Sequence, residues 1–314
     1  MFFFGGGWTG GSTAQFYKQS EYLASRGMVA MCADYRTGGK HKTSPRECVK
    51  DGKSAIRWIR QHAKELGVDP DMLAAGGGST GGHVAAATGT VKGFDEKGED
   101  VSISSRPNAL VLFNPVFDNG PGGYGYDRVK EYWKEFSPMH NIDENTPPTI
   151  VFLGTRDDLI PVATAERYKK IMEELKIRCD LHLYANQVHG FFNRARYRET
   201  LLETDKFLAS LGYLKGKLTL NRKWRPRVEH IHLPVDTLFS LYCAGANRSS
   251  SRTSAKLIGL RQGRKPMKWT VTNALSVDLL KWDCSSGLIS CWEWKKRSSH
   301  FSRSHRRWKS LSRQ

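Results

Sequence analysis

The sequence Gly-Gly-Ser-Thr-Gly at residues 77–81 matches the pattern G-x-S-x-G and lies between two different kinds of segment. The apolar residues 72–75 before it predict a short buried strand, and the small residues 82–87 after it predict the first turns of a helix. A serine on a sharp strand-to-helix turn has its hydroxyl exposed above the sheet, and small neighbours relieve the crowding of such a turn. This setting distinguishes the match from a flexible glycine loop, so we expect Ser79 to be a nucleophile.

A serine hydroxyl is a weak nucleophile until a base takes its proton. Among the ten histidines, His189 follows the apolar-alternating residues 181–184, which predict a strand, and therefore lies in a loop past a strand end. A loop carried by a rigid sheet is a common place for a catalytic group. His83 lies one turn into the predicted helix after Ser79, where we expect it to pack. His189 is therefore the expected base.

An acid is also needed, because it holds the imidazole in the correct tautomer. The apolar residues 149–153 predict another strand, and both Asp157 and Asp158 follow the end of this strand. Their position alone leaves both candidates open. The order along the chain is Ser, Asp, His, which is the order of an α/β-hydrolase rather than of the other triad folds.

Near the N-terminus, the phenylalanines at residues 2–4 predict an apolar strand that continues into Gly-Gly-Gly-Trp at residues 5–8. Glycines let backbone N–H groups approach a reacting carbonyl closely, and with the N–H of Thr80 they would form an oxyanion hole. The glycine stretch alone is equally consistent with a plain loop. The same chain also carries a serine, an aspartate and a histidine in the order of an α/β-hydrolase triad. This combination favours the oxyanion hole over the plain loop.

These four segments resemble the α/β-hydrolase esterases of the hormone-sensitive-lipase and acetyl-esterase type. That family has a His-Gly-Gly-Gly-Trp-like oxyanion loop, a Gly-x-Ser-x-Gly-Gly-His nucleophile elbow, a Gly-Thr-x-Asp-x-x-x-Pro acid loop and a His-Gly-Phe base loop. The matching segments here are residues 4–8, 77–83, 154–161 and 189–191. The resemblance covers residues 1–216, which we expect to form one catalytic domain.

The resemblance also implies roles for individual residues. The family's aspartate stands three residues after the glycine of the acid loop, which favours Asp157 over Asp158. The implied site residues are Ser79, Asp157 and His189 for the catalytic triad, and Gly6, Gly7 and Thr80 for the oxyanion hole.

Two features depart from the family pattern. Phe4 stands where the family usually has a histidine that shapes the oxyanion loop by hydrogen bonding, so we expect altered loop rigidity or a different acyl pocket. The family also has two strands and part of a third ahead of this loop, whereas the sequence begins inside that third strand. We therefore expect an N-terminally truncated sheet with an exposed edge, either because the true start lies upstream or because the protein is a fragment.

The remainder of residues 1–216 alternates predicted strands and helices. Helices are predicted at residues 14–26, 45–66, 161–177 and 199–214, and further strands at 28–33 and 108–117. Residues 44–47, Ser-Pro-Arg-Glu, predict a capping box with proline at the first helical position. The alternation predicts an α/β fold with a mostly parallel sheet covered by helices on both faces. The glycine- and aromatic-rich insert at residues 120–142 is either a surface excursion or a substrate lid.

Composition changes sharply near residue 217. Residues 217–314 hold 21 Lys and Arg against 5 Asp and Glu, whereas residues 1–216 hold 28 against 26, so most of the net charge of +18 belongs to the C-terminal segment. This segment also carries six of the nine tryptophans but few apolar runs that could offset the entropy of ordering. We expect a disordered basic tail or a read-through extension. If the tail is functional, its basic and aromatic residues would bind nucleic acid or an anionic membrane surface.

Nothing in the sequence indicates a metal or an organic cofactor. No lysine follows either glycine stretch at the spacing of a phosphate loop, and the six cysteines show no zinc or disulfide spacing. No apolar run approaches the roughly 18 residues of a membrane span. The first residues lack the features of a signal peptide, and with the true start in question localisation is left unassigned.

These observations predict a serine carboxylic-ester hydrolase that uses a Ser-Asp-His triad and an acyl-enzyme intermediate, and the resemblance implies short acyl chains. A prolyl-oligopeptidase-like serine peptidase is the alternative enzyme, since it shares this catalytic domain, although such peptidases usually carry a large N-terminal gating domain. A third hypothesis is an inactive hydrolase fragment whose basic tail binds polyanions.

Overall fold

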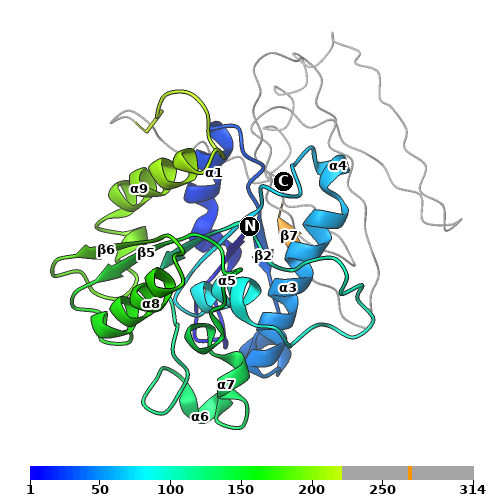
Figure 1. The fold of residues 1–314 in the computed structure, drawn as a ribbon, viewed down its shortest axis with the longest axis vertical. Coiled ribbons are helices and arrows are strands. Elements are labelled where there is room, and N and C mark those ends of the chain that lie inside the picture. Colours follow the sequence, from blue (N-terminus) through cyan, green and yellow to red (C-terminus); the bar gives the residue numbers. More distant parts are fainter. Residues whose placement is uncertain (221–267, 271–314) are drawn as a thin grey trace, which may run out of the picture. The chain divides into compact units, whose positions relative to one another are not determined.

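The computed structural model describes residues 1–220 and 268–270, and in this part of the chain the strands form one sheet of order β6-β5-β4-β3-β1-β2-β7 (Figure 1). The strands are β1 (Phe2–Phe3), β2 (Cys32–Asp34), β3 (Ala74–Gly78), β4 (Ala109–Phe113), β5 (Thr149–Gly154), β6 (Cys179–Tyr184) and β7 (Lys268–Thr270). Strands β1 to β6 pair in parallel, and β7 pairs antiparallel with β2. Parallel neighbours need crossover connections, which the intervening helices supply.

Helices cover both faces of this sheet (Figure 1). The α-helices are α1 (Tyr17–Ser25), α2 (Gly38–His41), α3 (Pro45–Gln61), α4 (Ala63–Leu66), α5 (Thr80–Thr90), α6 (Tyr126–Val129), α7 (Trp133–Phe136), α8 (Val162–Glu174) and α9 (Tyr197–Ser210). Short 3-10 helices are η1 (Thr13–Phe16), η2 (Pro138–Asn141) and η3 (Phe191–Asn193). The predicted mostly parallel sheet with helices on both faces is therefore confirmed.

Two apolar cores, one on each face of the sheet, hold these layers together. Side chains of α3, α5 and α8 share one core with Leu112, whereas side chains of α1 and α9 share the other with Val111. Adjacent residues of a strand point to opposite faces, so β4 is buried on both sides. A continuous apolar sequence such as that of β4 is typical of strands in this position.

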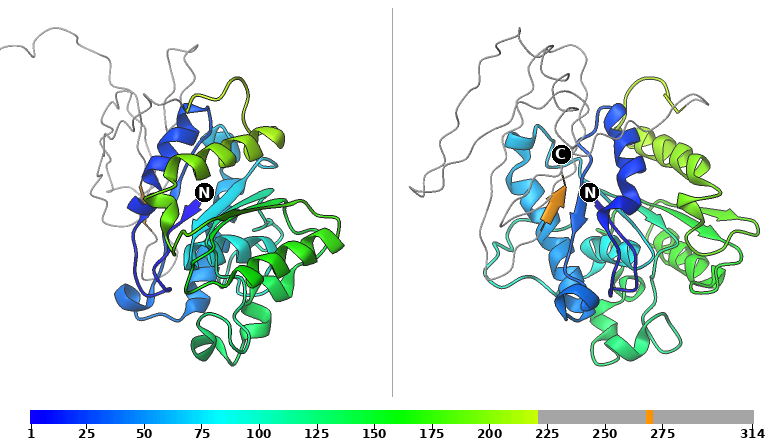
Figure 2. Two further views of the ribbon diagram at one scale, coloured as in Figure 1. Left: turned by 90° about the vertical axis from the view of Figure 1, so that its left-hand side faces the viewer. Right: turned by 180° about the vertical axis from the view of Figure 1, so that it is seen from behind.

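Helices α1 and α9 lie side by side on one face of the sheet (Figure 2). The hydroxyl of Tyr22 donates to Asp205 Oδ2 at 2.7 Å, and Arg26 Nε donates to the same carboxylate at 2.6 Å. The Arg26 side chain also donates to the carbonyls of Lys215 at 3.1 Å and Lys217 at 2.9 Å. Arg26 of α1 therefore binds both α9, through a buried ion pair with Asp205, and the segment that follows α9, through backbone carbonyls.

Helix α3 begins as the sequence predicts. The Glu47 carboxylate accepts hydrogen bonds from the Ser44 backbone N–H at 3.1 Å and from the Ser44 hydroxyl at 2.7 Å, and Pro45 is the first helical residue. The predicted helix at residues 45–66 is interrupted, because α3 ends at Gln61 and the short α4 follows His62. Val49 and Ile56 of α3 are fully buried.

The C-terminal segment lies almost entirely outside the described residues. Only residues 217–220 and 268–270 of it are described, so the domain boundary at 216/217, the disorder of the tail and its binding to polyanions stay predictions. Within the described residues, no helix is both long and apolar enough to cross a membrane.

Candidate active site

Ser79 lies on the turn between β3 and α5, where the sequence predicts it. Its backbone has φ +54° and ψ −122°, a conformation that L-residues rarely adopt and that is typical of strained functional turns. The Ser79 N–H donates to the Phe113 carbonyl at 2.9 Å, and the Ser79 carbonyl accepts from the N–H of Val116 at 3.2 Å. The end of β4 therefore fixes the turn that carries the serine.

The structure brings the three predicted triad residues together from the ends of three parallel strands. Ser79 follows β3, Asp157 follows β5 and His189 follows β6, and the carboxyl ends of parallel strands meet at one edge of a sheet. Ser79 Oγ lies 2.9 Å from His189 Nε2, and His189 Nδ1 lies 2.8 Å from Asp157 Oδ2. A carboxylate can only accept a hydrogen bond, so Nδ1 carries the hydrogen and Nε2 presents a lone pair to the serine.

Asp157 is held in place by its own loop. Its side chain is fully buried, and Oδ1 accepts hydrogen bonds from the backbone N–H groups of Leu159 at 3.0 Å and Ile160 at 2.9 Å. The neighbouring Asp158 is exposed, and in the part of the chain that the structure describes it makes no contact with His189. The geometry thus separates two candidates that chain order alone left open.

Asn114 is a polar contact of the imidazole that sequence analysis missed. This residue directly follows β4, is fully buried and has φ +35°. Its Oδ1 accepts the Gly190 N–H at 3.2 Å, while its Nδ2 lies 3.2 Å from His189 Nε2. The strand predicted at residues 108–117 extended past this position and was wrong there, because β4 ends at Phe113. The sequence does contain a signal for the end of this strand, because the polar Asn114 directly follows the five apolar residues of β4.

The glycine loop at residues 5–8 passes directly beside the serine turn. A Cβ atom on Gly5 would lie 2.6 Å from the Gly78 carbonyl oxygen and 3.0 Å from Ser79 Cβ, so only glycine permits this approach. The Trp8 N–H donates to Thr80 Oγ1 at 3.3 Å, which ties the loop to the start of α5.

The predicted oxyanion donors lie at this junction. Within residues 1–220 and 268–270, the backbone N–H groups of Gly6, Gly7 and Thr80 donate no hydrogen bond. For Thr80 this follows from its place in the first turn of α5, where N–H groups have no partner within the helix. In the part of the chain that the structure describes, these three N–H groups are thus left without an acceptor, and their role as an oxyanion hole stays a prediction.

Phe4 replaces the family's histidine with a different support for the loop. Its buried ring stacks on Tyr35, with ring centroids 4.3 Å apart and planes 16° from parallel. The Tyr35 hydroxyl donates to the Phe4 carbonyl, and burial raises the pKa of Tyr35 well above its usual range, so the donor stays protonated. In addition, the Gly5 N–H donates to Gln15 Oε1 at 2.7 Å.

The insert at residues 120–142 packs on the loop at residues 5–8 and on α5. It contains α6 and α7, which lie close together in Figure 1. Arg128 Nη1 donates to the Gly7 carbonyl at 2.6 Å, and its guanidinium lies 4.8 Å from the centre of the Trp8 ring. The insert therefore packs against the loop at residues 5–8, and its role as a substrate lid stays a prediction. His83 Nε2 lies 3.2 Å from the Phe136 carbonyl, and burial lowers the pKa of His83 to about 3, so this histidine stays neutral.

Gly6→Ala is expected to damage the oxyanion loop selectively. Gly6 has φ +142°, and an added Cβ would lie 2.3 Å from the Gly10 carbonyl oxygen, so the loop must shift. Loss of one oxyanion donor typically costs about 10²–10³ in kcat, which steady-state ester hydrolysis would measure. Gly10→Ala is the matched control, because its added Cβ meets nothing within 4 Å. Equal activity of the two variants would contradict the assignment of the loop.

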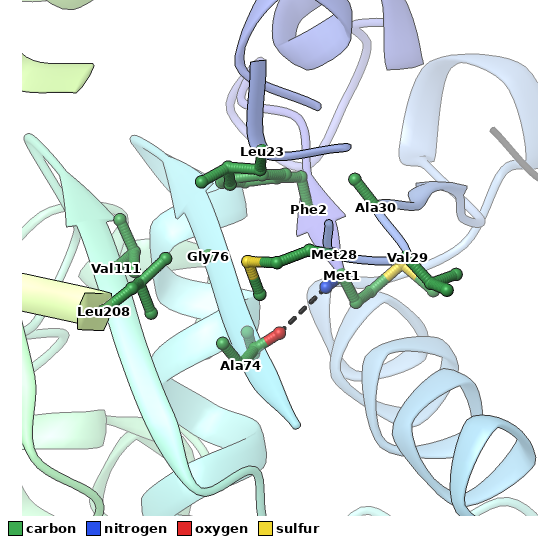
Figure 3. Close-up of a pocket in the computed structure, with 11 residues that line it drawn as sticks. Met1, Phe2, Leu23, Met28, Val29, Ala30, Ala74, Gly76, Val111 and Leu208 are labelled. Carbon is green, nitrogen blue, oxygen red and sulfur yellow. Dashed lines mark hydrogen bonds between the residues drawn. The ribbon is translucent and has the colours of Figure 1, made fainter. Parts of the chain in front are cut away.

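A small apolar cavity lies at the other end of the sheet (Figure 3). It has a volume of about 20 Å³ and is lined at the amino ends of β1 and β3 by Met1, Phe2 and Ala74, and also by Met28. The Met1 amino group donates to the Ala74 carbonyl at 2.8 Å. Ser79 follows the carboxyl end of β3, so this cavity is separate from the candidate active site.

Comparison with known proteins identifies the family. A family model described as BD-FAE matches residues 1–118, and one described as the dienelactone hydrolase family matches residues 123–213. A solved structure of a thermophilic esterase from the planctomycete Thermogutta terrifontis, with propionate bound, is 45% identical over 69% of this chain and 84% of that chain, with a TM-score of 0.64. The chain belongs to the α/β-hydrolase esterases. The resemblance drawn from the four sequence segments is thereby confirmed.

Further relatives carry the same class of name. Esterase LipC of Mycobacterium tuberculosis is 29% identical over 184 residues, covering 52% of this chain and 45% of that protein. The acetylxylan esterase of Xylanibacter ruminicola is 27% identical over 194 residues, covering 57% of this chain and 38% of that protein. The chain spans about half the length of the curated relatives it matches. The Thermogutta esterase has also been solved with butyrate bound and phosphorylated by paraoxon.

Proposed function

We propose that the chain is a serine carboxylic-ester hydrolase that acts on short-chain acyl esters. The observation that carries this proposal is the chain of contacts from Ser79 Oγ to His189 Nε2 at 2.9 Å and from His189 Nδ1 to Asp157 Oδ2 at 2.8 Å. A serine hydroxyl is activated when a base contacts it and an acid on the far side of the base orients that base. Membership in the α/β-hydrolase esterases supports the same reaction class.

In the acylation step, Ser79 Oγ attacks the ester carbonyl while His189 Nε2 takes the hydroxyl proton. The buried Asp157 carboxylate keeps Nδ1 protonated and stabilises the imidazolium that forms. The carbonyl oxygen becomes an oxyanion, which the N–H groups of Gly6, Gly7 and Thr80 would bind. The C–O bond to the alcohol then breaks, and His189 returns its proton to the leaving alkoxide.

In the deacylation step, the same groups act on water. His189 Nε2 takes a proton from a water molecule, whose oxygen attacks the acyl carbonyl of the Ser79 ester. The second oxyanion occupies the same N–H donors, and its collapse releases the carboxylic acid and returns the proton to Ser79 Oγ. In this proposal, the catalytic groups of both steps are the residues named above, and water is the second substrate.

Short acyl esters are the expected substrates. The Thermogutta esterase structures hold propionate and butyrate, and the insert of this chain packs tightly on the oxyanion loop through Arg128. We therefore expect kcat/KM for p-nitrophenyl acetate and butyrate to exceed that for the dodecanoate by about tenfold or more. Spectrophotometric assay of the three esters measures this ratio. A preference for the dodecanoate would contradict the substrate class, and hydrolysis of a prolyl p-nitroanilide in place of the esters would favour the peptidase alternative.

A further inference from the structure

We propose that Asn114 is a positioning residue that fixes the His189 imidazole and disfavours its doubly protonated form. The proposal rests on the proposed function, because it concerns the base of that reaction. Asn114 directly follows β4, the strand between β3, which precedes Ser79, and β5, which precedes Asp157. Through its two amide atoms it contacts the base ring at Nε2 and the backbone of the base loop at Gly190.

The orientation of the Asn114 amide follows from its partners. The Gly190 backbone N–H is a donor, so the atom that it contacts at 3.2 Å must be the amide oxygen. The amide nitrogen therefore faces His189 Nε2 at 3.2 Å. Because Asn114 is fully buried, water cannot replace its contacts with Gly190 and His189. Its backbone has φ +35°, which asparagine tolerates better than most residues.

This orientation has a consequence for the proton on the ring. In the resting site the Asp157 carboxylate holds the hydrogen on Nδ1, so the Nε2 lone pair can accept from the Asn114 amide or from the Ser79 hydroxyl. Once Nε2 carries a proton, its N–H and the amide N–H oppose each other. Asn114 thus favours the neutral base before attack and favours transfer of the proton to the leaving alkoxide afterwards.

The charged groups around the His189 ring determine how a change at Asn114 would act on it. In the part of the chain that the structure describes, the charged group in contact with His189 is Asp157, reached through Nδ1. Arg156 and Asp158 belong to the same acid loop but are exposed. The two neighbours of Nε2 in the described residues, Ser79 and Asn114, are uncharged. A charge placed at Asn114 would therefore act directly on the protonation of the base.

Asn114→Asp tests this inference by the pH dependence of ester hydrolysis. The substitution keeps the size of the side chain and the acceptor for Gly190, but it replaces the N–H that faces Nε2 with a carboxylate oxygen. The carboxylate stabilises the protonated ring, so we expect the acidic limb of the kcat/KM profile to move up by about 1 pH unit or more. Activity at pH 7 should fall about tenfold and recover as the pH is raised.

The matched control is Asn108→Asp, which makes the same change at the amino end of the same strand, where Asn108 contacts Leu73 and Arg60 instead of the triad. Its profile should follow that of the wild type. Asn114→Gly is a second variant, since glycine accepts φ +35° without strain. It should lower kcat about tenfold with little change in KM, because the ring loses a hydrogen bond that positions it.

The outcomes separate the inference from the proposed function. If the wild type is active and the pH profile of kcat/KM for Asn114→Asp coincides with that of the wild type, the inference alone is overturned. Full kcat in Asn114→Gly would overturn it as well. A wild type without esterase activity would overturn the proposed function and the inference together. A shifted acidic limb with recovery at high pH supports a role in the protonation of the base, which a merely structural asparagine would not produce.

Discussion

Ser79→Ala is expected to lower kcat/KM for p-nitrophenyl acetate by about 10⁴–10⁶, to the level of catalysis left when a triad loses its nucleophile. The substitution removes the oxygen that lies 2.9 Å from His189 Nε2 and leaves the other groups in place. Serine and alanine have the same Cβ, and both would adopt φ +54° at comparable cost, so the fold should persist. Steady-state kinetics would give the loss in rate, and thermal unfolding would show the unchanged fold.

The control for this prediction is Ser102→Ala. Ser102 is exposed, and its hydroxyl contacts Asp100 on a surface loop. This variant should retain wild-type rates. Retention of more than a small fraction of activity by Ser79→Ala would mean that another residue supplies the nucleophile.

Asp157→Asn has the second largest expected effect, a loss of about 10³–10⁴ in kcat. An asparagine amide can donate to Nδ1, which would place the ring hydrogen on Nε2 and remove the lone pair that faces Ser79. The side chain would keep its size, and its oxygen could still accept the N–H groups of Leu159 and Ile160. Substrate binding should therefore change little while turnover falls.

Asp158→Asn is the matched control for the acid, because it makes the same change at the next residue on an exposed side chain. It should keep nearly full turnover, measured under the same conditions. The reverse result, with Asp158→Asn inactive and Asp157→Asn active, would show that the contact at 2.8 Å does not identify the acid.

The sequence predicts those parts of the site whose position depends on residues adjacent in the sequence. The sequence predicts Ser79 because a strand, a tight turn and a helix follow one another within a few residues, and His189 because it comes shortly after an apolar strand. Position after a strand left both Asp157 and Asp158 open, and only the resemblance to the esterase family favoured Asp157. Parallel strands then place these three loops at one edge of the sheet. Chain order and strand periodicity therefore place the nucleophile and the base and narrow the acid to two neighbouring aspartates.

The parts that the sequence did not predict depend on contacts between distant segments. Asn114 meets His189 because β4 and β6 flank β5, and Tyr35 supports Phe4 because β2 lies beside β1. Such partners have no signature in their own neighbourhood. The end of β4 was misplaced for a local reason, since the apolar Val116 continues the pattern after Pro115, although the chain turns at Asn114.

Reaction with paraoxon tests the central claim most directly, because an activated serine displaces p-nitrophenol from this phosphate ester and keeps the diethylphosphoryl group. We predict that esterase activity disappears in step with modification, and that peptide mass spectrometry finds the diethylphosphoryl group on Ser79. A fully modified protein that keeps its activity, or a modification found on another residue while Ser79 remains free, would contradict the account.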